Sequence, residues 1–431
     1  MKREAVCTPL RKLTNEKLVT LLTLCLALSL PATAHAQAGQ LDKSFGKGGI
    51  FDGLNAPALA SSQAAALTIQ SDGKILIAGQ FQAPNGVIQP CVVRLTPVGT
   101  LDNSFGQQGV ATVSLGHGGN ELFTGAVVQA DGKIVVAVSS GGADDAPVLE
   151  LARFESNGAL DTSFGTAGIL LLVRGQQDSS SIAQQPDGKI LVGGGSLLAR
   201  VNSDGSLDNT FGTGGLAPVI SPATAIALQT NGQIVLPASH YNANGSVDTT
   251  FGTLGRIASL GPVSPARVQS DGKIVAAGTV TSKVILGQLP NITNVTGFGV
   301  SRYNANGSLD LSFGHQGGVV TDFSSVGPVT TASDLAIESN GDIIVAGQAG
   351  QPFSITSISS PASFALARYT PTGALDSGFG AGGKLVTSFG KTATAGIVAV
   401  AIDSEGRLVA AGNVAPTGTT GSIVVARYLT K

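Results

Sequence analysis

The stretch RYNANGSLDLSFG, Arg302 to Gly314, decides the fold, because parts of it return throughout the chain. Its last six residues recur at intervals of 40 to 66 residues in seven places: LDKSFG at Leu41, LDNSFG at Leu101, LDTSFG at Leu160, LDNTFG at Leu207, VDTTFG at Val247, LDLSFG at Leu309 and LDSGFG at Leu375. Self-similarity at such a period indicates a repeat architecture in place of several unrelated domains.

Two further sequence features accompany the hexapeptide. A turn sequence lies about 30 residues after most copies: Asp72-Gly73, Asp131-Gly132, Asp187-Gly188, Asn231-Gly232, Asp271-Gly272, Asn340-Gly341 and Glu405-Gly406. Each unit then ends in Arg and an apolar residue, except that the fourth has His240-Tyr241: Arg94-Leu95, Arg153-Phe154, Arg200-Val201, Arg302-Tyr303, Arg368-Tyr369 and Arg427-Tyr428. Seven units therefore fill the chain from Leu41 to Lys431.

Each unit has the pattern of short β-strands. Runs such as KIVVAG and FALARY are rich in β-formers and are bounded by Gly, Asn, Asp and Pro. Asp-Gly and Asn-Gly favour tight hairpins, because Gly accepts the positive φ of the turn. Four short strands per unit predict an all-β fold, either an open solenoid or a closed β-propeller.

The two ends of the repeat array favour the propeller. In six units Arg or His lies eight residues before the next Asp, a spacing that places the pair opposite each other across a hairpin. Arg427 has no such Asp after it, and Asp42 has no Arg before it. A closed ring would pair Asp42 with Arg427, whereas a solenoid would leave both alone. We therefore predict a seven-bladed propeller closed by the N-terminal segment.

These marks resemble a known family. The order LDxSFGxxG, strand, DGKIxVAG and FALARYNxxGSLD is similar to the delta-60 repeat of exported bacterial proteins, and more loosely to the NHL-type propeller repeat. The resemblance covers nearly all of the chain after the first 36 residues and implies β-propeller blades, but it implies no common activity. The fourth unit departs from the pattern, with only QIVLPASHYN between its two turns, so we expect a reduced blade there.

Composition narrows the function. Only 12% of the 431 residues are charged, the net charge is −2, and basic runs are absent from the sequence. Nucleic acid and anionic membrane surfaces are therefore not expected partners. The 42% hydrophobic content requires a buried core.

The first 36 residues have the pattern of a cleaved signal peptide. A basic segment precedes the apolar run Leu18 to Leu30, and Ala34-His35-Ala36 gives a small-x-small cleavage site. Thirteen apolar residues are too few for a membrane span, which needs about 20. We expect cleavage before Gln37, a periplasmic or extracellular location, and one propeller domain over residues 37–431. Cys91 is then the single cysteine, so no internal disulfide is expected.

Residues suited to catalysis are scarce. After residue 36 the histidines are His117, His240 and His315. His240 occupies the Arg position of its unit, and the other two lie in Gly-rich turns with no acid beside them. A catalytic site needs a base, a nucleophile and an orienting group. We therefore assign no catalytic, cofactor-binding or metal-binding residue and expect no cofactor.

Calcium is the alternative that the sequence leaves open. NSDGSLD, Asn202 to Asp208, has oxygen ligands at alternating positions around a Gly. The same loop has Val98 and Thr372 in place of the central Asp in two other units. A hairpin turn whose Asp pairs with Arg accounts for every unit, so we favour it.

Other site types find little support. Gly-rich pieces such as GKGG precede strands, whereas a phosphate cradle needs a helix N-terminus. Flat aromatic sugar platforms are not expected, because Trp is absent and all four tyrosines, Tyr241, Tyr303, Tyr369 and Tyr428, follow the Arg or His position.

We therefore expect a monomeric, non-catalytic module for binding, adhesion or scaffolding, with an unidentified protein or glycan as ligand. Alternating strands put the Asp-Gly turns and the uniform LDxSFG connections on one face. The variable links, including Gly278 to Gly297 and Gln348 to Ser363, then lie on the opposite face, where we place the binding site. The alternative is a lactonase-like or lyase-like propeller enzyme with acids or histidines gathered at the mouth of the central channel.

Overall fold

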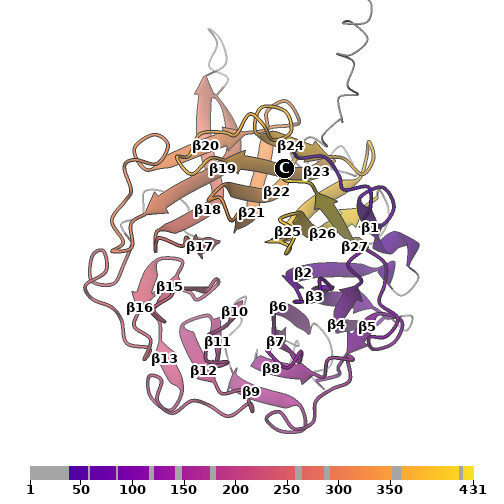
Figure 1. Ribbon diagram of the computed structural model, residues 1–431, viewed down its shortest axis with the longest axis vertical. Helices are drawn as coiled ribbons and strands as arrows, with labels where there is room; N and C mark the ends of the chain where they lie inside the picture. The colour runs from indigo at the N-terminus through magenta and orange to yellow at the C-terminus, as the bar shows by residue number, and fades with distance from the viewer. Residues whose placement is uncertain are drawn as a thin grey trace, which may run out of the picture.

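The computed structural model is a ring of seven β-blades around a central axis (Figure 1). The seven blades form six sheets, because a parallel bridge between Ala362 and Thr394 joins blades 6 and 7. The structure describes residues 38–56, 59–83, 86–115, 121–140, 148–174, 181–257, 265–285, 292–351, 361–416 and 421–431. The regular elements of these ranges are 27 strands and the 3-10 helix η1 (Gly53–Asn55). The all-β propeller predicted from the repeats is therefore confirmed. The predicted signal peptide, residues 1–36, lies outside the described ranges.

The blades follow the repeats along the chain, with the innermost strand first. Blade 1 consists of β2 (Ser62–Ile69), β3 (Ile75–Gln82), β4 (Ile88–Leu95) and β5 (Val110–Thr112). Blade 2 consists of β6 (Leu122–Val128), β7 (Ile134–Ser140), β8 (Val148–Phe154) and β9 (Ile169–Arg174). Blade 3 consists of β10 (Ser181–Gln184), β11 (Ile190–Gly194), β12 (Leu197–Val201) and β13 (Leu216–Pro218). Blade 4 is β14 (Ala227–Leu228), β15 (Ile234–Leu236) and β16 (Ser239–Tyr241). Blades 5 and 6 are β17 (Ala266–Val268), β18 (Ile274–Ile285), β19 (Ile292–Tyr303) and β20 (Gly318–Asp322); and β21 (Val329–Ile337), β22 (Ile343–Gly350), β23 (Ala362–Tyr369) and β24 (Lys384–Thr387).

Blade 7 is built from both ends of the chain. Its inner strands are β25 (Thr394–Ile402), β26 (Leu408–Ala415) and β27 (Ser422–Tyr428), and its outer strand is β1 (Ile50–Asp52). β1 pairs antiparallel with β27, with Ile50 opposite Ala426 and Asp52 opposite Val424. The Nε atom of Arg427 lies 2.8 Å from Oδ2 of Asp42. The predicted closure of the ring by the N-terminal segment is confirmed.

Blade 4 is reduced, as its short repeat predicts. Its strands have only two or three residues each. A single bridge between Ser239 and Arg256 stands in place of a fourth strand among the described residues. The blade keeps its position in the ring because Tyr241 and Phe251 are both buried against its neighbours.

The hydrophobic core is divided into seven clusters, one at each interface between adjacent blades. Successive side chains of a strand point to opposite faces of the sheet, so each blade contributes apolar residues to the clusters on both of its sides. In β26, Val409 and Ala411 face blade 1, whereas Leu408 and Ala410 face blade 6. Every blade therefore depends on two neighbours for the burial of its apolar surface. Among the described residues, no helix is long and apolar enough to cross a membrane.

The turn between the third and fourth strands shows how well the two chain ends match the repeat. In blade 4 this turn is closed by Gly245 N–H donating to Asn242 O at 2.9 Å, and Asn242 N–H to Ser246 O at 2.8 Å. In blade 7 the corresponding bonds run between chain ends: Gly39 N–H donates to Leu429 O at 2.7 Å, and Leu429 N–H to Gln40 O at 2.9 Å. Thr430 and Ala38 therefore occupy the positions that Ala243 and Asn244 hold in blade 4.

A circular permutant that joins Thr430 directly to Ala38 should fold, because that junction restores the turn length of the other blades. New termini would open after Ala83, in a connection on the opposite face. We expect an unchanged far-UV circular dichroism spectrum and a melting temperature within a few degrees of the parent. The control is the same permutant without residues 38–56, which lacks β1, Asp42 and Phe45 and should melt far lower. Equal melting of the two permutants would contradict closure by the N-terminal segment.

Candidate functional site

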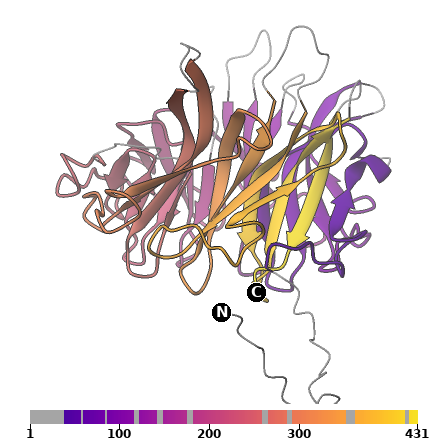
Figure 2. The same ribbon diagram turned by 90° about the horizontal axis from the view of Figure 1, so that it is seen from above.

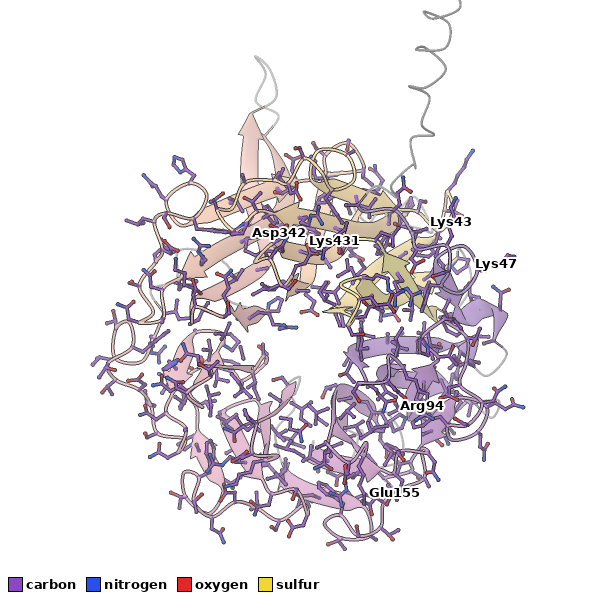
Figure 3. The ribbon with its side chains drawn as sticks, in the orientation of Figure 1. Lys43, Lys47, Arg94, Glu155, Asp342 and Lys431 are labelled. Atoms are coloured by element: carbon purple, nitrogen blue, oxygen red, sulfur yellow. The ribbon has the colours of Figure 1, made fainter. Side chains whose placement is uncertain are left out.

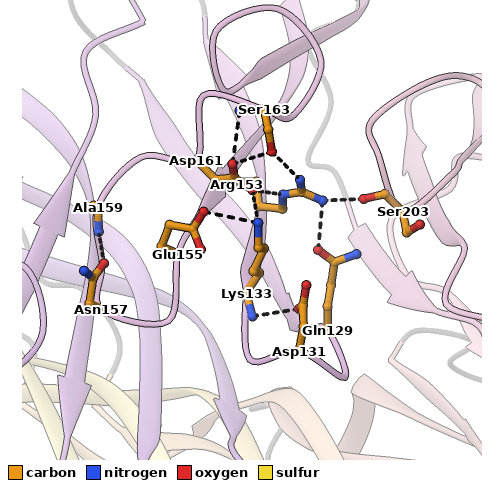
Figure 4. Close-up of polar contacts among 10 residues, drawn as sticks. All are labelled: Gln129, Asp131, Lys133, Arg153, Glu155, Asn157, Ala159, Asp161, Ser163 and Ser203. Carbon is orange, nitrogen blue, oxygen red and sulfur yellow. Dashed lines mark hydrogen bonds and ion pairs between the residues drawn. The ribbon is translucent and has the colours of Figure 1, made fainter.

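The face that carries the Asp-Gly turns is dominated by one repeated polar network, shown for blade 2 in Figure 4. Arg153 follows the core residues of β8, and its Nε donates to Asp161 Oδ2 at 2.6 Å across the hairpin. One guanidinium nitrogen donates to the carbonyl oxygen of Ser203 in blade 3. Ser163 completes the set by donating to Asp161 Oδ1 at 2.6 Å. The network thus ties a blade to its own turn and to the next blade.

Six of the seven units contain this Arg–Asp pair, with N···O distances of 2.6 to 2.8 Å: Arg94–Asp102, Arg153–Asp161, Arg200–Asp208, Arg302–Asp310, Arg368–Asp376 and Arg427–Asp42. Each guanidinium also lies over the Phe of its own hexapeptide, 4.3 to 4.8 Å from the ring centroid. The pairs predicted from the eight-residue spacing are therefore confirmed. The contact with the next blade was not predicted, because a spacing within one unit carries no information about its neighbour.

In six of the seven units, the network lowers the pKa of its aspartate below the usual value and so favours the ionised form. Burial alone would raise the pKa of Asp161, but hydrogen bonds from Lys133 and Ser163 outweigh it and hold the pKa well below its usual range. The pKa values of Asp208 and Asp310 are lowered in the same way. A carboxylate that stays ionised and fully hydrogen-bonded is a poor general acid or base near neutral pH. These acids therefore serve the structure.

Blade 4 replaces the arginine with His240, which is 1% exposed. Its ring stacks on Phe251 at a centroid distance of 4.1 Å. Nε2 lies 2.8 Å from Gln229 Oε1, and Nδ1 lies 3.1 Å from Asp248 Oδ2. Burial lowers the pKa of His240, and Asp248 offsets this only in part. His240 is thus a neutral substitute in the structural network.

The loop proposed as a calcium alternative, Asn202 to Asp208, is a closed turn. Asp204 Oδ1 accepts hydrogen bonds from the backbone and hydroxyl of Ser206 at 2.9 and 2.7 Å. Asp208 Oδ2 accepts hydrogen bonds from Arg200 Nε and Lys189 Nζ at 2.6 and 2.8 Å. Over the described ranges of the chain, no three or more His, Cys, Asp and Glu residues converge in a way that could hold a metal ion.

The other residues singled out in the sequence occupy separate places. His315 is exposed at the turn before β20, and His117 lies outside the described ranges. Cys91 is buried in β4, and burial raises the pKa of its thiol to about 12. A thiol with so high a pKa is unreactive near neutral pH. The four tyrosines are fully buried, so their rings form no platform for a ligand.

The first strand of each blade is the innermost and lies nearest the axis of the ring. Along these seven strands the charged residues are Arg267 in β17 and Asp334 in β21, whose Nη2 and Oδ1 atoms are 2.7 Å apart. The same Asp334 oxygen accepts the backbone N–H of Leu335 at 2.8 Å, and the other oxygen accepts that of Val400 at 2.9 Å. The carboxylate is thus fully occupied in joining blades 5, 6 and 7. No sequence pattern indicates this pair, because the two residues are 67 positions apart.

The opposite face carries the connections between the second and third strands of each blade and between successive blades, and in Figure 2 it lies above the ring, on the side away from the C-terminus. Its most prominent described feature is the hairpin β18–β19, in which twelve residues pair with twelve. Most of the link expected from Gly278 to Gly297 is therefore strand, because its β-branched residues continue the cross-strand ladder. In the second expected link, Gln348–Gly350 belong to β22 and Ala362–Ser363 to β23. Residues 352–360 lie outside the described ranges.

The hairpin β18–β19 is hydrogen-bonded to blade 6. The backbone N–H of Ala332 donates to Thr279 Oγ1 at 3.1 Å, and that of Thr330 donates to Thr296 Oγ1. Thr296 N–H in turn donates to Pro328 O at 3.1 Å. These contacts fix the direction in which the hairpin rises from the ring.

The sequence matches the family described as "Domain of unknown function (DUF5122) beta-propeller" in five segments: residues 70–105, 129–164, 185–211, 269–313 and 338–379. Each segment begins two residues before an Asp-Gly or Asn-Gly turn and ends at the Phe of the hexapeptide. The unmatched units are the reduced blade 4 and blade 7, which is split between the chain ends. The chain is therefore a β-propeller repeat protein.

The matching solved structures have low sequence identity and TM-scores below 0.5. Polysaccharide lyase Uly1 is 11% identical with a TM-score of 0.35, and the match covers 84% of this chain and 76% of that one. A protein of unknown function from Dyadobacter fermentans is 8% identical with a TM-score of 0.39, over 92% and 98% of the two chains. The α-L-arabinofuranosidase arb93a from Fusarium graminearum is 8% identical with a TM-score of 0.38, over 85% and 93%. No curated protein matches the chain.

Replacing His240 with Arg should stabilise the protein and remove one source of acid sensitivity. The folded-state pKa of His240 is lowered, so its stabilising effect is present above the unfolded pKa of about 6.5 and is lost as the pH falls below it. The His240→Arg guanidinium would reach a carbonyl of blade 5, as in the other units. We expect the free energy of unfolding to rise by about 1–2 kcal/mol at pH 7.

The measurement is urea unfolding at several pH values between 7.5 and 5. The parent should lose stability toward pH 5, and the His240→Arg variant should lose less. His315→Gln, at an exposed histidine, is the control and should follow the parent. Parallel pH profiles for His240→Arg and the parent would show that His240 does not titrate on unfolding.

Proposed function

We propose that this β-propeller repeat protein is an exported, non-catalytic module for binding, adhesion or scaffolding, and that it is a monomeric delta-60 repeat protein. Its ligand would be a protein or a glycan. The observation that carries the proposal is the division between the two faces. On the turn face the ionisable side chains of the repeat are engaged with one another, whereas the opposite face carries the segments that differ most between units.

The hairpin β18–β19 supports a binding role for the variable face. A two-stranded ribbon is only marginally stable in water by itself. The ring supports the base of this one through Thr279 and Thr296, and its strands continue to Ile285 and Ile292. Twelve-residue strands are far longer than blade geometry requires, since blade 4 completes its place in the ring with strands of two or three residues. The additional length suits contact with a partner.

Export is proposed from the sequence of the first 36 residues, with a basic segment, a short apolar run and Ala34-His35-Ala36. Expression with the native leader in a bacterial host should yield a protein whose N-terminal sequence begins at Gln37 and which fractionates with the periplasm or the medium. An Ala36→Tyr variant should block cleavage, because signal peptidase requires a small residue there. Retention of an intact N-terminus by the parent would contradict the proposal.

Shortening the variable face should abolish binding without unfolding the ring. One variant replaces residues 283–294 with Asn-Gly, which suits a two-residue hairpin between Ser282 and Val295, a directly opposed pair. A second replaces residues 352–360 with Gly-Gly between Gln351 and Pro361, which are joined by a backbone hydrogen bond of 3.1 Å. We expect both to melt within a few degrees of the parent.

Binding would be measured on an array of purified polysaccharides, on peptidoglycan sacculi, and by crosslinking to bacterial envelope proteins. We expect at least one variant to lose about tenfold in affinity for the ligand that the parent binds, a change of about 1.4 kcal/mol. The control is Glu405→Gln, an exposed substitution on the turn face, which should bind as the parent does. Unchanged binding by both shortened variants would exclude this face.

A further inference from the structure

A cleft of about 1000 Å³ lies on the outer rim of the ring, at the junction where the N-terminal strand β1 closes blade 7. β1 and the adjoining η1 form its floor. Its walls are the turn around Thr100 in blade 1 and the segment Ser388–Phe389 that links blade 6 to blade 7. The cleft lies beside the fourth strand of blade 7, the strand that the N-terminal segment supplies.

The floor of the cleft is apolar. Ile50, Leu101 and Phe389 are partly buried and pack on the two hydrophobic clusters that flank blade 7, and their remaining surface lines the cleft. Phe51 is 9% exposed beneath them. The Phe389 ring is anchored against Phe364 at a centroid distance of 4.8 Å. This volume, with an apolar floor and a few polar groups at the edge, is typical of a small-molecule site.

The rim of the cleft carries one uncommitted charge. Asp52 lines the cleft, but its Oδ1 accepts Leu54 N–H at 3.0 Å and its Oδ2 accepts Asn55 Nδ2 at 2.9 Å, so it is engaged in capping η1. The exposed Lys47 is in no ion pair with a described carboxylate. Figure 3 places Lys47 at the outer edge of the ring beside β1, near the equally exposed Lys43.

Lys47 is specific to this junction. The position after Phe-Gly in the seven units is occupied by Lys47, Gln107, Thr166, Thr213, Thr253, His315 and Ala381. The turn itself therefore does not require a cation, since six other residues form it. An ammonium group beside an apolar floor favours a ligand that combines an apolar body with a negative charge.

We propose that this rim cleft binds a small amphipathic organic anion, with its apolar body on Ile50, Leu101 and Phe389 and its carboxylate or sulfonate beside Lys47. The site is separate from the variable face and does not depend on the binding function proposed there. The polar side chains of Asn55, Thr100 and Gln108 at the edge of the cleft supply hydrogen bonds to the polar end of the ligand.

Two dyes that share one ring system test the charge and the floor separately. 1-Anilinonaphthalene-8-sulfonate carries a sulfonate, and N-phenyl-1-naphthylamine lacks it, and both fluoresce on entering an apolar site. We expect the wild-type protein to bind both dyes. Lys47→Gln should weaken binding of the sulfonate dye about fivefold, the upper range for one exposed charge pair, and leave the neutral dye unchanged. Phe389→Ser should weaken binding of both dyes.

Two further variants complete the experiment. Lys43→Gln removes a neighbouring exposed charge that does not line the cleft, and it should bind both dyes as the parent does. Ser388→Trp fills the cleft and should block both dyes; circular dichroism will verify its fold. Equal sulfonate-dye affinity for Lys47→Gln and the parent, an equal loss in Lys43→Gln, or no binding by the parent would each overturn the proposal. The Lys47 variant keeps the test decisive should Ser388→Trp fail to fold.

Discussion

The ring depends on a buried guanidinium that belongs to two blades at once. Each arginine of the network pairs with an Asp of its own hairpin, lies over the Phe of the same hexapeptide, and reaches a carbonyl oxygen of the next blade. A buried ion pair by itself gives little net stability, because desolvation offsets the Coulomb attraction. Removing one partner is costly, however, since it leaves a charge buried without compensation. The arginine therefore acts mainly by specifying which turn packs beside its blade, because only the correct neighbouring turn offers a carbonyl oxygen to the buried guanidinium.

The Phe of the same hexapeptide also packs against the turn of the next blade, beneath the arginine. The Phe ring of one blade packs against a Gly in the turn of the next, and a Cβ added to Gly158 would lie 3.0 Å from the Phe105 ring. Arg94 lies over that ring and donates to Ser156 O at 2.5 Å in the same turn. Burial of the ring, approach of the Gly and the guanidinium contact therefore occur together. At blade 7, Gly39 packs against Phe379 of blade 6, and Phe45 packs against Gly99 of blade 1. Both interfaces of this blade therefore have the same parts as the others, although the backbone is broken there.

The sequence predicts what is local to a unit and repeated. Seven hexapeptides predict the blade count, the eight-residue spacing predicts the pairing of Arg427 with Asp42, and the short fourth unit predicts the reduced blade. Contacts between units are a different matter. The acceptor of Arg153 is 50 residues away and is a backbone oxygen, which leaves no mark in the side-chain pattern. Arg267 and Asp334 meet only because the inner strands of adjacent blades lie side by side around the axis of the ring. The Gly278 to Gly297 segment was expected to be a connection, and its length concealed that β-branched residues had extended both strands.

Function follows from where the repeat leaves residues free. On the turn face a change at one Asp or Arg disturbs two blades, so this face has little freedom to acquire a ligand. The variable face and the seam are released from that constraint for different reasons. On the variable face, connections can lengthen without touching the network, as the hairpin β18–β19 does. Beside β1, the cleft lined by Asn55 of η1 and by Ser388–Phe389 carries Lys47, and the six other units have no Lys at that position. Lys47 can be cationic there because its turn makes no demand on the side chain, so its charge is available for a ligand.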